Sequence, residues 1–298
     1  MAKYEIIDGV AILPEGIEMI EDKAFLDCKE LKCVVIPQWV RRIGDSAFKG
    51  CEKLEVVELP EWLEVIGERA FEFCSSLKEL TLPQWVKRIE GYAFWRCSSL
   101  QNLSIPSFVT HIENGAFLDC SSLVRIKVDS NNPVYDSRED CNAIIHTESN
   151  ALICGCSNTI IPSSVTSIED RAFQGCTSLT QISLPPSVTS IELCAFAGCK
   201  SLTQISIPPS VTSIGDWAFS GCKFLTQISI PPSVTSIGEH AFSGCKSLTQ
   251  ISIPPSVTSI ERCAFFGCTS LTLVKVSKNT ELVRNAFRNC PNVKIERY

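Results

Sequence analysis

Apolar and polar residues alternate over short segments of this chain, as they do in a β-strand with one buried face. In residues 225–230, Leu225, Ile228 and Ile230 are apolar, and the residues between them are Thr, Gln and Ser. This pattern predicts a short strand whose apolar side faces a core. Pro231 and Pro232 follow directly and should end the strand, because proline has no backbone N–H to donate to a central β-ladder.

The segment recurs at a fixed interval, which an Ala-Phe pair marks most clearly. Successive phenylalanines of this pair are 23 residues apart in both halves of the chain, and the last interval is one residue shorter. A period of this length is typical of a solenoid, in which each unit stacks only on its neighbours. The marker residues are Phe25, Phe48, Phe71, Phe94 and Phe117, then Phe173, Phe196, Phe219, Phe242, Phe265 and Phe287.

Each repeat carries too few apolar residues to fold alone. After the strand, Val234 and Ile237 lie on the return path, and Ala241 and Phe242 direct a ring back into the interior. These side chains are buried only when neighbouring repeats cover them. We therefore predict a curved solenoid of about eleven rungs, with parallel β-strands on one face.

One insertion interrupts the period. The interval between Phe117 and Phe173 is ten residues longer than two repeats, and residues 142–147 and 151–154 flank a short polar turn. These features predict a β-hairpin inserted at 129–158 within one domain that spans 1–298. Residues 1–24 are predicted to form an N-terminal cap and first partial repeat, in which Val10, Ile12 and Leu13 begin the core, and residues 277–298 a C-terminal cap.

The first half carries aromatic residues in the turn that follows the strand. Trp39, Trp62, Trp85 and Phe108 are one period apart, so they should stack as a single stripe on adjacent rungs. Basic residues lie beside them at Arg41-Arg42 and Lys87-Arg88. The rings either cover the turn edge as packing or form a binding stripe, in which Arg42 and Arg88 would contribute charge.

The repeats of the second half are nearly identical. Their strands place a glutamine at the same position of four successive rungs, at Gln181, Gln204, Gln227 and Gln250, and a serine two residues later. Such rows either form side-chain ladders that stabilise the stack or present a repetitive hydrogen-bonding face to a glycan or an extended partner.

Eleven of the 17 cysteines follow the repeat phenylalanine by three residues. This placement predicts a row of buried thiols whose S–H groups reach loop carbonyls. The odd total and the parallel side chains favour free thiols and a reducing compartment. In the insert, Cys141, His146, Cys154 and Cys156 are candidate zinc ligands, but a hairpin with core-facing cysteines accounts for them more simply.

The composition narrows the function further. A net charge of −6 without clustered basic residues argues against nucleic-acid binding. We find no signal-peptide pattern and no apolar run long enough to span a membrane. The three histidines occupy unrelated repeat positions, so no Cys-His or Ser-His pairing is indicated. We therefore expect a monomer that is not an enzyme and needs no cofactor or metal.

The repeated phrase Pro-Pro-Ser-Val-Thr-Ser-Ile-Gly-x-x-Ala-Phe-x-Gly-Cys resembles the BspA-like class of leucine-rich repeats, and the insert resembles an interruption common in that family. The resemblance covers essentially the whole chain. It implies a curved solenoid with a role in adhesion, because family members are typically surface or secreted proteins of host-associated microbes. It would place the protein at the cell surface, whereas the start of the chain and the thiol row favour the cytoplasm.

The sequence thus predicts a scaffold that binds a protein or glycan partner, such as host matrix or a cell surface, without inserting into the membrane. The aromatic stripe is the preferred site and the glutamine row the second. The alternative is an intracellular structural repeat protein, or a fragment of a larger surface protein, with no ligand of its own.

Overall fold

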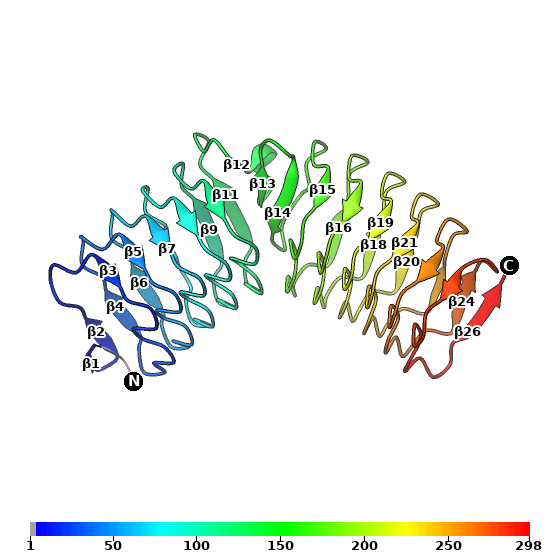
Figure 1. The fold of residues 1–298 in the computed structure, drawn as a ribbon, viewed down its shortest axis with the longest axis horizontal. Coiled ribbons are helices and arrows are strands. Elements are labelled where there is room, and N and C mark those ends of the chain that lie inside the picture. The colour runs from blue at the N-terminus through cyan, green and yellow to red at the C-terminus, as the bar shows by residue number, and fades with distance from the viewer. Residues whose placement is uncertain (1–3) are drawn as a thin grey trace. The chain divides into compact units, whose positions relative to one another are not determined.

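The computed structural model describes residues 4–298. The chain divides into two compact units, which we call unit 1, ending at Thr147, and unit 2, from Glu148 to Tyr298. Each unit is a stack of β-coils in which strands of successive repeats lie side by side (Figure 1). Counted over the described residues, the chain makes about 13 turns rather than the eleven expected.

Unit 1 contains two columns of short strands and, within the described residues, a single 3-10 turn; one column is interrupted at residues 77–82, where no strand forms. Its elements are β1 (Ile6–Ile7), β2 (Val10–Ile12), β3 (Met19–Ile20), β4 (Cys33–Val35), β5 (Arg42–Ile43), β6 (Val56–Glu58), β7 (Val65–Ile66), β8 (Arg88–Ile89), β9 (Asn102–Ile105), β10 (His111–Ile112), β11 (Arg125–Val128), β12 (Tyr135–Asp136), η1 (Arg138–Asp140) and β13 (Ala143–His146).

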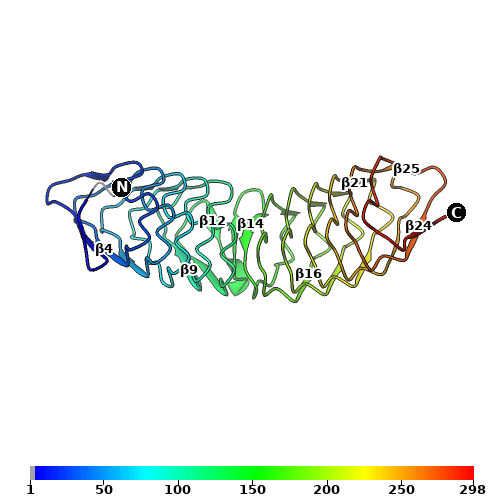
Figure 2. The same ribbon diagram turned by 90° about the horizontal axis from the view of Figure 1, so that it is seen from below.

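Unit 2 is more regular, and its two strand columns lie on opposite sides of the stack, as β16 and β21 illustrate in Figure 2. Its elements are β14 (Ala151–Gly155), β15 (Ser167–Ile168), β16 (Gln181–Ser183), β17 (Ser190–Ile191), β18 (Gln204–Ser206), β19 (Ser213–Ile214), β20 (Gln227–Ser229), β21 (Ser236–Ile237), β22 (Gln250–Ser252), β23 (Ser259–Ile260), β24 (Leu273–Val276), β25 (Glu281–Leu282) and β26 (Lys294–Arg297).

Parallel pairing sets the register at one repeat. Gln204 of β18 pairs with Gln227 of β20, and Ser213 of β19 pairs with Ser236 of β21. Within each three-residue strand the middle isoleucine is buried and the flanking Gln and Ser are exposed. The predicted alternation of core and surface positions is therefore confirmed, and identical side chains form continuous rows along unit 2.

A column of phenylalanine rings fills the core of each unit. Neighbouring rings have centroids 5.0–5.4 Å apart and are close to parallel, and Phe219, for example, stacks between Phe196 and Phe242. The interior rings of both columns are fully buried, whereas Phe287 at the end of unit 2 is only partly covered. The phenylalanine that marks the repeat period in the sequence thus lies along the axis of the core.

A backbone ladder that the sequence pattern did not predict runs through the Ala-Phe turn. Alternate N–H groups in this turn donate to carbonyls of the following repeat, while the residues before Ala and before Cys adopt positive φ. Left-handed backbone at these two positions turns the amides outward along the stack. In one turn the bonds run from Trp217, Phe219 and Gly221 to the carbonyls of Glu239, Ala241 and Ser243, at 2.8, 2.7 and 2.7 Å.

The repeat cysteines form a second row of inter-repeat bonds. The Cys222 thiol donates to the Phe196 carbonyl of the preceding repeat at 3.2 Å, and eight other ladder cysteines make the same contact. All 17 cysteines are free thiols in the structure. The prediction that buried S–H groups reach loop carbonyls is confirmed, and each thiol adds a second donor to a carbonyl that already accepts a backbone N–H within its own repeat, as Phe196 does from Cys199.

One expectation about the N-terminal segment needs revision. Ile12 is 70% exposed and Val10 only half-buried, while Ala11 is buried because it pairs with Val34 in the core position. The prediction that Ile12 begins the core was therefore one residue out of phase. In the insert, β13 and β14 form at the two segments predicted as strands, and β12 pairs antiparallel with β13.

Candidate functional site

The aromatic stripe lies in the turns between the two strand columns of unit 1. The rings of Trp62 and Trp85 stack with centroids 5.7 Å apart, and those of Trp85 and Phe108 with centroids 4.8 Å apart. Trp39 joins no ring stack among the described residues and is 64% exposed, whereas Trp62 and Phe108 are 41% and 43% exposed. The stripe is therefore a stack of three rings with a separate tryptophan at its N-terminal end.

The basic residues beside the stripe already have acidic partners. Arg42 pairs with Asp45 at 3.1 Å, and Arg88 with Glu90 at 2.9 Å. Glu64 accepts from Lys87 at 2.7 Å and from the preceding repeat's arginine, Arg41, at 2.8 Å, and these two bonds lower the pKa of Glu64. The flank of the stripe is thus close to neutral, which differs from the basic flank that the sequence suggested.

Unit 2 has no aromatic residue at the stripe position. The equivalent residues are serines, and three of them donate to the carbonyl of the preceding rung: Ser187 to Val165 at 2.5 Å, Ser210 to Val188 at 2.6 Å and Ser233 to Val211 at 2.7 Å. The same turn therefore closes by hydrogen bonds in unit 2, so packing of the turn edge does not itself require large rings.

The glutamine row faces a groove of about 1600 Å³ on unit 2. Strands β16, β18, β20 and β22 form its floor, and Ser157–Ile161 lie at its N-terminal end. Its C-terminal end is formed by Lys275 of β24 and by Tyr298, whose hydroxyl donates to the Ile253 carbonyl at 2.8 Å. The groove is lined by the exposed side of the parallel strands.

Hydrogen-bonding capacity differs between neighbouring rows of this face. The threonine row is occupied, because Thr203 donates to the Thr180 carbonyl and Thr226 to the Thr203 carbonyl, both at 3.2 Å. The glutamine row is not: within residues 4–298, none of the carboxamides of Gln181, Gln204, Gln227 and Gln250 bonds to another protein group. Of the two alternatives for this row, the four carboxamides do not form a side-chain ladder, and the amides remain available to a ligand.

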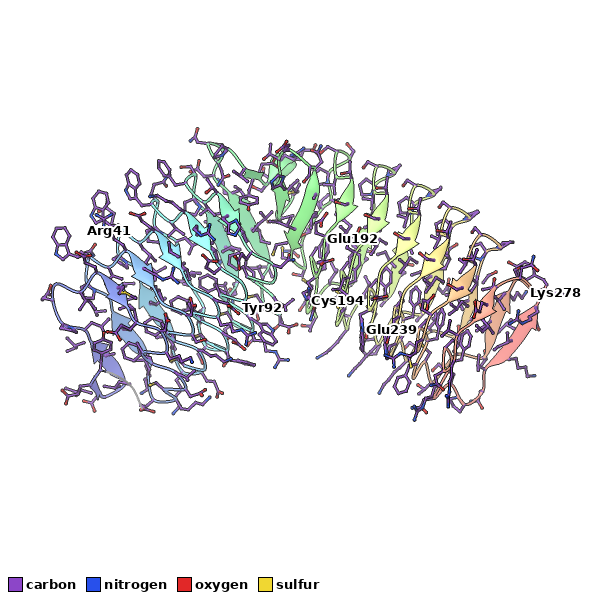
Figure 3. The ribbon with its side chains drawn as sticks, in the orientation of Figure 1. Arg41, Tyr92, Glu192, Cys194, Glu239 and Lys278 are labelled. Atoms are coloured by element: carbon purple, nitrogen blue, oxygen red, sulfur yellow. The ribbon has the colours of Figure 1, made fainter. Side chains whose placement is uncertain are left out.

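A third surface, which the sequence analysis missed, lies at the Ala-Phe turns of unit 1. Arginine guanidinium groups lie over aromatic rings there, 5.2–5.4 Å from the ring centroids. Figure 3 shows Tyr92 of this cluster and Arg41, beside the stripe, at opposite edges of unit 1. No periodic signal marks the cluster, since its residues occupy variable positions of successive repeats: Arg69, Phe73, Tyr92, Trp95 and Arg96.

Only one group of side chains in residues 4–298 has metal-ligand spacing. It consists of Glu90, His111 and Glu113, whose potential ligand atoms lie within 4.8 Å of one another. Arg88 already engages Glu90, and the Gly91 N–H donates to Glu113 at 2.8 Å. The candidate zinc ligands of the insert do not form such a group, and His146 instead packs edge-on against Tyr135.

Burial works against nucleophilic activation of the core thiols. Burial raises the pKa of Cys51, Cys154 and Cys222 to about 12. A reactive cysteine needs the opposite shift, because the thiolate is the nucleophile. These three thiols are therefore poor nucleophiles, whereas a hydrogen bond with Cys268 lowers the pKa of Cys290.

No helix in residues 4–298 has the length and apolar character needed to cross a membrane.

The family model described as "BspA type Leucine rich repeat region" matches residues 12–138 and 149–272. No curated protein matches the chain.

Solved structures of bacterial repeat proteins are similar over nearly the whole chain. The pneumococcal vaccine antigen PcpA is 26% identical, with a TM-score of 0.86, over 97% of this chain and 74% of PcpA. A leucine rich cell surface protein from Faecalibacterium prausnitzii A2-165 is 27% identical, with a TM-score of 0.64, over 98% and 88%. A leucine-rich repeat protein from Eubacterium ventriosum ATCC 27560, at 24% identity over 96% and 77%, has a TM-score of 0.82 and shares the fold.

Proposed function

Because the chain belongs to the BspA-type leucine-rich repeat family, we propose that it is a non-enzymatic interaction scaffold of the adhesion type, which binds a protein partner through the aromatic stripe of unit 1. Repeat scaffolds of this family generally serve protein interaction. Two similar proteins are described as a cell surface protein and as a vaccine antigen, which supports a role in contacts with other molecules.

The exposure of the aromatic stripe is the observation that carries this proposal. Trp39 and Trp62 expose 64% and 41% of their surface although the turn can close without them, as the serines of unit 2 show. Tryptophan and arginine are the residues most enriched among those that dominate binding energy. Exposed, stacked rings lose little conformational entropy on binding, so they suit a site for an apolar patch rimmed by charge.

The ion pairs beside the stripe define the kind of partner. Arg42 and Arg88 are each paired with a carboxylate, so their positive charge is largely neutralised, while their guanidinium N–H groups can still donate hydrogen bonds. A partner that presents apolar side chains surrounded by mixed charges complements this surface better than a polyanion does.

A binding screen tests the proposal. The purified protein is immobilised and exposed to extracellular-matrix proteins and to a glycan array, beside a variant with Trp39, Trp62 and Trp85 replaced by alanine. Trp217→Ala, which removes an exposed tryptophan of unit 2, is the matched control. We expect a protein ligand whose affinity falls at least tenfold in the triple variant alone. Circular dichroism must show that the variant remains folded.

Unchanged binding by the folded triple variant would exclude the stripe as the site. Absence of any ligand would favour the structural role, in which the rings only cover the turn edge. A ligand that is found solely on the glycan array and is still bound by the triple variant would show that the binding site lies on another surface.

A further inference from the structure

The groove of unit 2 presents unused amide groups in a regular row. Gln181, Gln204, Gln227 and Gln250 project from successive parallel strands, and each carboxamide offers two N–H donors and an accepting oxygen. Two residues further along each strand, a second exposed row consists of serines. A ligand that satisfies these groups must therefore offer donors and acceptors at a spacing set by the rungs.

The long dimension of the groove follows the stack. Each strand of its floor is three residues long, which is about 10 Å, whereas the four successive strands at a spacing of about 4.8 Å span about 14 Å, and the lining extends beyond them to Ile161 and Lys275 at its two ends. A linear ligand that fills the groove therefore runs across the strands, and meets one glutamine at each rung.

A polypeptide in the polyproline II conformation has the matching repeat. It completes a turn every three residues with a rise of about 3.1 Å each, so its repeat is about 9.3 Å, close to the ~9.6 Å between every second rung. Its backbone makes no internal hydrogen bonds and leaves its carbonyls free to accept from glutamine N–H groups. The two-residue repeat of a β-strand, about 6.6 Å, does not match, and an α-helix has no free backbone groups.

The distribution of charge and of rings specifies the ligand further. The side chains that line the groove are neutral except for that of Lys275, whose ammonium group has no ion-pair partner within residues 4–298. An uncharged segment with a carboxylate at the Lys275 end is the complementary partner. Tyr298 is the only aromatic residue in the lining, and its hydroxyl is already bound to Ile253, so the glutamine rungs lack the flat rings on which a sugar could stack.

We propose that this groove binds an uncharged polypeptide segment in the polyproline II conformation, which lies along the stack and places an acidic residue beside Lys275. The inference rests on the proposed role of the chain as an interaction scaffold, but it uses a different surface from the aromatic stripe.

Fluorescence anisotropy with labelled peptides tests the inference. The first probe contains three Pro-Pro-Ser units followed by Glu, the second ends in Lys instead, and the third is a helical Glu-Ala-Ala-Ala-Lys repeat of similar length. The double variant Gln204→Ala/Gln227→Ala removes two central amides, and Gln101→Ala, an exposed glutamine of unit 1, is the control. We expect the first probe to bind best, with at least tenfold weaker binding to the double variant and unchanged binding to Gln101→Ala.

The Lys275→Gln variant tests the charged end. It should bind the Glu-ended and Lys-ended probes equally, whereas the wild-type protein should prefer the Glu-ended probe at least threefold. Equal binding of the helical probe, an unaffected double variant, or displacement of the peptide by cellohexaose would overturn the inference.

The stripe variant separates this inference from the proposed function. Replacement of Trp39, Trp62 and Trp85 should leave peptide binding unchanged. If the protein partner binds the stripe and no peptide binds the groove, the groove inference alone fails. If the peptide binds and the stripe variant loses no partner, the proposed stripe function alone fails.

Discussion

Removal of one interior ring of the phenylalanine column should cost far more than removal of the terminal ring. Phe219 is fully buried and stacks on two neighbours, with centroids 5.4 Å from both. Phe219→Ala removes the burial of the ring and leaves a cavity, at a cost of about 3–5 kcal/mol. The two lost ring pairs place the expected value near the upper end, at about 4–5 kcal/mol.

Phe287 and Phe224 provide the comparison within the same unit. Phe287 is half-buried and has a single stacking partner, Phe265, at 5.2 Å, so Phe287→Ala should cost about 1–2 kcal/mol. Phe224 is 60% exposed, and its replacement by alanine should change the free energy of unfolding by less than about 0.5 kcal/mol.

Urea denaturation followed by circular dichroism gives the free energies of unfolding for the three variants. Native-state hydrogen exchange, read by mass spectrometry, shows in which repeats protection is lost. We expect loss of protection centred on the repeats that contact residue 219. Equal costs at Phe219 and Phe287, or an exchange increase spread evenly over unit 2, would refute the view that each repeat is stabilised by its immediate neighbours.

Three further substitutions test other contacts. A Cβ at Gly155 would lie 2.1 Å from the Phe173 ring, so Gly155→Ala should lower the free energy of unfolding by more than about 3 kcal/mol. A Cβ at Gly221 would have no neighbouring atom nearer than 3.7 Å, so Gly221→Ala should cost only about 1 kcal/mol, from backbone strain at positive φ. The midpoints of urea denaturation check both values. Lys49→Met removes the ammonium 2.8 Å from the buried Glu72 carboxylate and leaves it only the Arg69 guanidinium, 4.0 Å away, so it should cost about 3 kcal/mol, most of which Lys49→Met/Glu72→Leu regains in a double-mutant cycle. Because burial raises the pKa of Cys222 from 9.0 to about 12, its contribution to stability is complete below pH 9 and is lost between pH 9 and 12; wild-type protein should therefore lose ~1–2 kcal/mol more than Cys222→Ala between pH 7 and 10.5.

The periodic features of the fold could be predicted from sequence because burial repeats with the period. The repeat positions of Phe219 and Cys222 hold an apolar or weakly polar residue in each repeat, so their burial in the core follows directly from the pattern. The left-handed positions could not be found in the same way. Gly221 signals one of them, but the other is occupied by Trp217 and, in earlier repeats, by Lys, Ser and Arg, none of which marks positive φ.

Surface chemistry was predicted less completely than the core. The exposure of Trp62 and Gln204 follows from their positions, but the acidic partner of Arg42 lies three residues away and was not considered. The sequence also gave no indication that the glutamine amides would stay unbonded while the adjacent Thr203 hydroxyl is occupied. Which of two polar rows bonds internally depends on side-chain geometry, and a one-dimensional pattern does not contain it.

The near identity of the pairing residues in unit 2 has a genetic consequence. Gln204 meets Gln227 and Ser206 meets Ser229, so removal or duplication of one interior repeat recreates the same contacts at the junction. Unit 1 differs, because ion pairs such as Lys29–Glu52, at 2.6 Å, join side chains that differ from rung to rung. Unequal recombination can therefore change the number of coils in unit 2 without creating a mismatched interface between repeats. The length of the groove then changes by one repeat at a time, and selection can act on that length.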